Sequence, residues 1–139
     1  MILSESKKKI TSAKDITEIM RLILSKEDEI DRMKEHCWCV GVNNKNVIQY
    51  IELVSLGTLT SSFVHPREVF RLAITKCVNN VFLVHNNPSG EIYPSKEDDM
   101  VTKRIKDAGD IIGIKLLDHV IICDANEDYY SYQSMGKIN

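Results

Sequence analysis

The stretch His85-Asn86-Asn87-Pro88-Ser89-Gly90-Glu91-Ile92-Tyr93-Pro94-Ser95-Lys96-Glu97-Asp98 decides the fold of this chain. It follows Val81-Phe82-Leu83-Val84, a short and continuously apolar run that is typical of a central strand buried on both faces. The Pro, Ser and Gly residues of 86–94 predict a loop, and a helix is expected from about Ser95 to Ala108. His85 is therefore expected where a buried strand ends, just before the loop.

The helix after this loop is expected to turn one carboxylate inward. Val101, Ile105 and Ala108 follow the helical period and form an apolar stripe that should face the body of the protein. Asp98 lies on the same stripe, in the first turn. Ser95-x-x-Asp98 also matches a capping box, which is an alternative explanation for both residues. An imidazole and an inward carboxylate that meet at the carboxyl end of a strand are typical of sites in α/β folds.

The remaining segments predict a single α/β domain with a mixed sheet between helices. We expect a first helix that starts at Asp15-x-x-Glu18, a hairpin around Asn43–Asn46, and a helix that starts at Pro66 and is closed by Asn79-Asn80. The inward face of that second helix is predicted to consist of Val69, Phe70, Ala73, Ile74 and Cys77. Two further apolar runs, Ile111–Leu117 and Val120–Cys123, are expected to be strands.

Composition excludes several classes of protein. The 139 residues suit one domain, and 18 Lys and Arg against 20 Asp and Glu give no long-range field that would gather phosphates. No apolar run approaches the roughly 20 residues needed to span a bilayer, and no secretory signal is recognisable, so a cytoplasmic protein without a membrane partner is expected. The four cysteines are expected to be reduced thiols in the core.

These motifs resemble the RadC-like branch of the JAMM (MPN-domain) metalloprotease family, which has a cytidine-deaminase-like α/β fold. The family motif is an upstream Glu, then His-x-His-Pro, then Ser-x-x-Asp, and its RadC branch reads His-Asn-His-Pro-Ser-Gly. Other similar segments are Gly57-Thr58-Leu59, Val64–Arg71, Leu117–Ile122 and Tyr130–Gly136. The resemblance implies a RadC-like JAMM/MPN domain over 33–139, preceded by a helical appendage over 1–32.

The resemblance also implies a zinc site and two catalytic residues. His85 and Asp98 match two of the three zinc ligands, and Asn87 stands where the family has its second ligand histidine. Glu35 matches the glutamate that takes a proton from zinc-bound water. Ser95 matches the serine that holds the oxygen of the tetrahedral intermediate. Three protein ligands leave a fourth position for water, whose pKa falls to about 7 on zinc.

Asn87 departs from this pattern, and the departure weakens the expected site. A carboxamide oxygen is a poorer zinc ligand than an imidazole, because zinc favours nitrogen and sulfur donors. Changes to the partners of metal ligands already cost about 10–100-fold in affinity, so a lost ligand should cost at least as much. We therefore expect zinc to be weakly bound or absent, unless His119 or His65 substitutes for the missing histidine.

Three functions follow from these observations. The first is a zinc-dependent hydrolase of amide or isopeptide bonds, a metallopeptidase that is weakened or degenerate. The second is a non-catalytic interaction module, and the third is a DNA-repair-associated protein, as the family is labelled. The net charge of −2 argues against avid DNA binding. Whether the chain is an enzyme, which peptide it would cleave and how it oligomerises are left open by the sequence.

Three other residue groups have both a functional and an ordinary interpretation. Glu52 is a rival general base, but an outward-facing strand carboxylate is the favoured interpretation. His65 is expected to cap the helix that follows it. Tyr129, Tyr130 and Tyr132 could stack on bases, but packing of a terminal strand is favoured because no surrounding group of Lys and Arg is evident.

Overall fold

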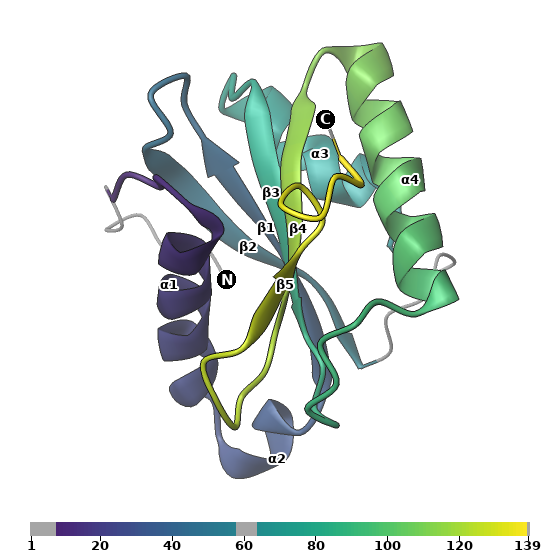
Figure 1. The fold of residues 1–139 in the computed structure, drawn as a ribbon. Coiled ribbons are helices and arrows are strands. Elements are labelled where there is room, and N and C mark those ends of the chain that lie inside the picture. The colour runs from purple at the N-terminus through teal and green to yellow at the C-terminus, as the bar shows by residue number, and fades with distance from the viewer. Residues whose placement is uncertain (1–7, 58–63, 139) are drawn as a thin grey trace.

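A five-stranded mixed sheet in the order β2-β1-β3-β4-β5 forms the centre of the computed structural model, which describes residues 8–57 and 64–138 (Figure 1). The strands are β1 (Glu35–Val42), β2 (Ile48–Gly57), β3 (Asn80–Asn86), β4 (Lys115–Ile122) and β5 (Tyr129–Ser131). The helices are α1 (Ala13–Ser25), α2 (Glu29–Arg32), α3 (Pro66–Thr75) and α4 (Lys96–Ile112). Among the described residues, no helix has the length and apolar character that a membrane span requires.

The sheet combines antiparallel and parallel pairs, as predicted. β1 pairs antiparallel with both β2 and β3, β3 runs parallel to β4, and β5 pairs antiparallel with β4. The hairpin between β1 and β2 turns at Asn46, which has a φ of 61°, and the Asn43 carboxamide accepts hydrogen bonds from the backbone N–H groups of Lys45 and Val47. Asparagine tolerates this left-handed backbone better than most residues do.

Helices cover both faces of the sheet, with α1 on one side and α3 and α4 on the other (Figure 1). Because side chains alternate along a strand, Trp38 of β1 packs with the α1 cluster while its neighbours Cys37 and Cys39 pack with α3 and α4. This architecture confirms the prediction of a single α/β domain. The proposed division between an appendage at 1–32 and a domain at 33–139 stays a prediction.

The end of α4 differs from the sequence prediction. The helix continues through Ile111 and Ile112, which are 84% and 48% exposed, and Gly113 ends it in a left-handed conformation with a φ of 81°. The prediction of two separate strands in this region is therefore wrong. A single strand, β4, runs from Lys115 to Ile122. The apolar character of the two isoleucines suggested a strand, but helix–strand assignment in short apolar runs is ambiguous.

The end of α3 also differs from the prediction. The left-handed position belongs to Cys77, with a φ of 55°, and not to Asn79 or Asn80. The N–H of Val78 bonds to the carbonyl of Ala73, and that of Cys77 to the carbonyl of Ile74, which is the Schellman pattern. Cys77 and Ile74 are exposed and not part of the inward face, so only three of the four cysteines are core residues, although all four are free.

Candidate metal site

His85 and Asp98 lie next to each other at the end of β3 that meets the loop to α4. The Nε2 atom of His85 is 3.6 Å from Oδ1 of Asp98, and both residues are buried. His85 is the second-last residue of β3, and Asp98 is in the first turn of α4, so the loop between them brings a strand end and a helix start together. The two side chains that the sequence predicts to converge do so.

Asp98 also closes a capping box with Ser95. The second carboxylate oxygen, Oδ2, accepts a hydrogen bond from the Ser95 N–H at 2.9 Å, and the Asp98 N–H donates to Ser95 Oγ at 3.1 Å. The functional and the capping interpretations of this motif are therefore compatible, because the carboxylate uses one oxygen for each. The cap fixes the orientation of the oxygen that faces His85.

His119 and Thr102 extend this pair into a buried network. The Nε2 atom of His119 is 2.7 Å from Nδ1 of His85, and its Nδ1 atom is 2.5 Å from Oγ1 of Thr102. Both ring nitrogens of His119 therefore have partners, and its role as a substitute metal ligand stays a prediction. Sequence reasoning did not include Thr102 in the site. Its position four residues after Asp98 on the same helix was the available signal.

Burial favours the neutral form of the two imidazoles. Loss of solvent lowers the pKa of His85 to about 4, although the nearby Asp98 carboxylate acts in the opposite direction. Burial likewise lowers the pKa of His119, and the neighbouring His85 adds to this effect. A neutral imidazole is the form that binds a metal ion.

Asn87 is engaged elsewhere through its side chain. Its Oδ1 atom accepts hydrogen bonds from the backbone N–H and the hydroxyl of Ser89, at 3.2 and 2.9 Å. Its backbone N–H bonds to the carbonyl of Ile122 at 3.0 Å, so the main chain is held independently of the side chain. Over residues 8–57 and 64–138, no group of three or more His, Cys, Asp or Glu side chains could hold a metal ion. His85 and Asp98 are thus the two strong metal-binding side chains of this site.

Glu35 begins β1 beside the end of β3. Cys37 pairs directly with His85 in the antiparallel ladder, and Glu35 precedes Cys37 by two residues, so it belongs to the same face of the sheet as His85. Glu35 is half-buried. Of the similar segment Gly57-Thr58-Leu59, Thr58 and Leu59 lie outside the described residues.

Glu52 differs from its favoured interpretation, whereas His65 is the N-cap residue of α3, as expected. Glu52 does not face outward: it is buried on the face of α3, where Arg71 donates to its Oε2 at 2.9 Å. Its Oε1 atom has no hydrogen-bond partner among the described residues. His65 occupies the position before α3, but its side chain makes no capping hydrogen bond. A strand period of two allowed either face for Glu52, and the sequence did not decide between them.

Replacing Glu52 with glutamine is expected to make stability less dependent on pH. Burial raises the pKa of Glu52 in the folded chain, and Arg71 offsets this only in part. The folded state holds the Glu52 proton more tightly than the unfolded state does. The contribution of Glu52 to stability is therefore fully present below the ordinary carboxyl pKa, and it is lost as pH rises through the raised pKa of the folded state. Urea unfolding at about pH 4 and about pH 7 should show a smaller loss in Glu52→Gln than in the unchanged chain. An equal or larger loss in the variant would contradict this assignment.

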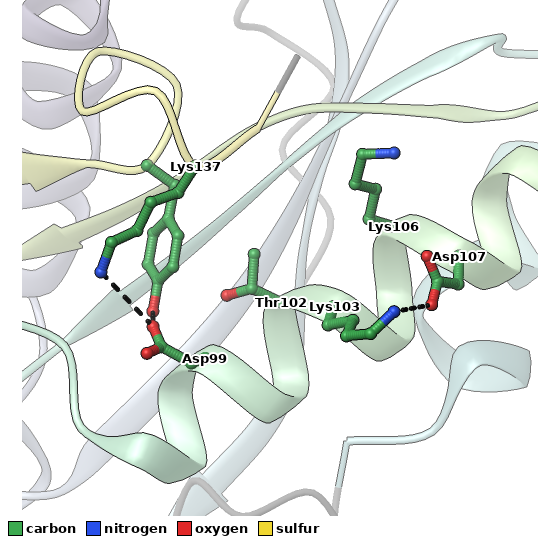
Figure 2. Close-up of a pocket in the computed structure, with 7 residues that line it drawn as sticks. Asp99, Thr102, Lys103, Lys106, Asp107 and Lys137 are labelled. Atoms are coloured by element: carbon green, nitrogen blue, oxygen red, sulfur yellow. Dashed lines mark hydrogen bonds and ion pairs between the residues drawn. The ribbon is translucent and has the colours of Figure 1, made fainter.

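A pocket of about 340 Å³ lies between α4 and the segment that carries Tyr132 and Lys137, and Thr102 also lines it (Figure 2). Its charged side chains are largely matched: Lys103 pairs with Asp107 at 2.8 Å, and Lys137 lies 3.9 Å from Asp99. The Tyr132 hydroxyl donates to Asp99 at 2.7 Å. The Tyr132 ring stacks on His119, with centroids 4.9 Å apart and planes at 5°. This tyrosine is buried, so it supports the histidine and is not available to stack on bases.

Comparison with known proteins shows the family. The sequence pattern of the RadC-like JAB domain matches residues 10–137. A UPF0758 protein of Chlorobaculum parvum is 43% identical over 126 residues, which cover 91% of this chain and 54% of that protein. UPF0758 proteins of Caldanaerobacter subterraneus and Listeria monocytogenes are 44% and 47% identical, over 89% and 74% of this chain and 54% and 45% of their own lengths.

The chain thus spans about half the length of the curated relatives it matches. The matched region includes β3, the loop and α4, which supply His85 and Asp98. The fold, the order of the motifs and the length of the match agree with one another. This chain belongs to the RadC-like JAB domain family.

Proposed function

We propose that this chain is a zinc-dependent hydrolase of amide or isopeptide bonds whose metal site is weakened by Asn87. The separation of 3.6 Å between His85 Nε2 and Asp98 Oδ1 supports the proposal. Tetrahedral zinc with bonds of about 2.0–2.2 Å holds neighbouring donor atoms about 3.3–3.6 Å apart. The two donors therefore fit zinc as they stand.

The third donor fits less well. A carboxamide oxygen is a weak zinc ligand, and Asn87 Oδ1 would have to leave its two hydrogen bonds with Ser89 to reach a metal ion. We therefore propose that zinc is held by His85 and Asp98, with Asn87 as a weak third ligand. When bound, zinc supplies a Lewis acid that polarises a carbonyl group and lowers the pKa of water to about 7.

The chain's own residues would supply the remaining chemistry. Glu35, on the same face of the sheet as His85, would take a proton and deliver it to the leaving amine. Ser95 Oγ already accepts the Asp98 N–H, so the single proton of its hydroxyl can be donated to a substrate oxygen. Four free cysteines are consistent with the reducing cytosol that we propose as the location.

An activity assay with the ligand restored tests this function. Zinc-loaded Asn87→His should cleave a fluorogenic peptide or a lysine isopeptide reporter faster than the unchanged chain. Adding Glu35→Gln should lower that rate by about 10²–10⁴-fold, as expected for loss of a general acid–base. Glu127→Gln, an exposed loop position, is the matched control and should leave the rate unchanged.

The alternative is a non-catalytic interaction module. The engaged carboxamide of Asn87 favours it, because that side chain is already satisfied without a metal ion. If Asn87→His binds zinc at His85 and Asp98 but cleaves neither reporter, the hydrolase proposal is wrong and the module remains.

A further inference from the structure

Four residues of the candidate site, Thr102, His119, His85 and Asp98, form a closed ring of contacts, called the circuit below. The Thr102 hydroxyl donates to the backbone carbonyl of Asp98 at 2.8 Å and lies 2.5 Å from Nδ1 of His119. His119 Nε2 lies 2.7 Å from Nδ1 of His85. His85 Nε2 in turn faces the Asp98 carboxylate at 3.6 Å. The circuit thus starts at the main chain of Asp98 and ends at its side chain, and all four residues are buried.

The protons in this circuit can be assigned from the threonine. A hydroxyl has one proton, and that of Thr102 is used on the Asp98 carbonyl, which can only accept. Thr102 Oγ1 must therefore accept from His119, whose proton lies on Nδ1. A neutral imidazole has one N–H, so His119 Nε2 accepts the proton of His85 Nδ1. His85 Nε2 is then left with a lone pair that points toward Asp98.

The reverse assignment leaves the contact between Thr102 and the Asp98 carbonyl unsatisfied. If Thr102 donated to His119, its oxygen and the Asp98 carbonyl oxygen would face each other at 2.8 Å without a proton between them. At 3.6 Å from Asp98 Oδ1, His85 Nε2 has no hydrogen bond to that oxygen in either assignment, so this contact does not decide between them. The contact between Thr102 and the Asp98 carbonyl selects the first assignment.

We infer that Thr102 and His119 are positioning residues that hold His85 in the Nδ1–H form, with the bare Nε2 turned toward Asp98. Partners of metal-binding histidines commonly fix the ring tautomer through the nitrogen that does not bind the metal. Stacking of the Tyr132 ring on His119 restricts rotation of that imidazole. The consequence for zinc rests on the proposed function, whereas the tautomer itself does not.

Long-range ¹H–¹⁵N NMR of the metal-free, ¹⁵N-labelled chain at neutral pH measures the tautomers directly, because protonated and bare ring nitrogens differ strongly in ¹⁵N shift. We expect both His85 and His119 to carry their proton on Nδ1. A proton on Nε2 of His85 would overturn the inference. No metal ion and no substrate enter this measurement.

Three threonine variants then test the start of the circuit. Thr102→Val keeps the shape without the hydroxyl and should shift His85 toward a mixture of tautomers, whereas Thr102→Ser should retain the Nδ1–H form. Thr17→Val is the matched control, since Thr17 is also buried and also donates to the carbonyl four residues earlier, at 2.9 Å, but lies in α1 on the opposite face of the sheet. Unchanged tautomers in Thr102→Val would show that Thr102 has no positioning role.

Zinc titration separates this inference from the proposed function. In the Asn87→His background, Thr102→Val should weaken zinc binding by about 10–100-fold, Thr102→Ser should restore it, and Thr17→Val should not change it. If Asn87→His does not bind zinc but the tautomers are as expected, the function is wrong and the inference stands. If Thr102→Val does not fold, the tautomers of the unchanged chain and of Thr102→Ser still decide the question.

Discussion

Replacing Asn87 with histidine should raise zinc affinity by at least about 10–100-fold. The variant would add a third strong donor beside His85 Nε2 and Asp98 Oδ1, which already lie 3.6 Å apart. The exchange removes two side-chain hydrogen bonds to Ser89, but the backbone bond from Asn87 to Ile122 does not depend on the side chain. Isothermal titration with a zinc salt, or competition with a chelating dye, measures the change.

Two controls make this result specific to the site. Asn79→His adds a histidine at an exposed position before β3 and should leave zinc affinity unchanged. Adding Asp98→Asn to Asn87→His keeps the side-chain shape, removes the anionic ligand and should abolish the gain. Equal affinities for Asn87→His and the unchanged chain would show that residue 87 does not face the metal.

Replacing Gly109 with alanine should destabilise the fold by about 1–3 kcal/mol, although alanine is the better helix former by about 1 kcal/mol. A Cβ atom at Gly109 would lie 2.2 Å from the backbone oxygen of Ile114 and 3.0 Å from the ring of Phe70. The first contact is with main chain, which cannot rotate away. The overlap would push α4 away from α3 and from the chain that leads into β4, and α4 also holds Asp98 and Thr102.

Asp110→Ala is the matched control for this effect, because the next residue of α4 is exposed and its carboxylate forms a surface ion pair with Lys106, which contributes little to stability. Its stability should stay within about 0.5 kcal/mol of the unchanged chain. Urea unfolding of both variants measures the difference. A Gly109→Ala variant that is as stable as its control would mean that α4 does not pack as closely as described.

The sequence predicted the parts of the fold that depend on clear periodicity. The apolar run Val81–Val84 and the stripe of Val101 and Ile105 are buried as expected, because a wrong orientation would expose several apolar side chains together. Helix ends were less predictable. Cys77 ends α3 and Gly113 ends α4 through backbone conformations that a single residue type does not determine.

The candidate site was predictable in its direct members but not in its supporting ones. His85 and Asp98 were placed by the end of a strand and the stripe of a helix. The role of Thr102 depends on a parallel neighbour, β4, that brings His119 beside His85 across 34 positions of sequence. Such long-range pairing cannot be read from spacing. The burial of Glu52 was unpredictable for the same reason, because its partner Arg71 comes from a different element, α3, which packs on that face.

Anomalous diffraction from zinc-soaked crystals of Asn87→His tests most directly whether this pocket is built to hold a metal ion. We predict one strong peak within bonding distance, about 2.0–2.2 Å, of both His85 Nε2 and Asp98 Oδ1. A map with no peak there, or with zinc bound only at surface residues while the two side chains keep their contact, would contradict the account.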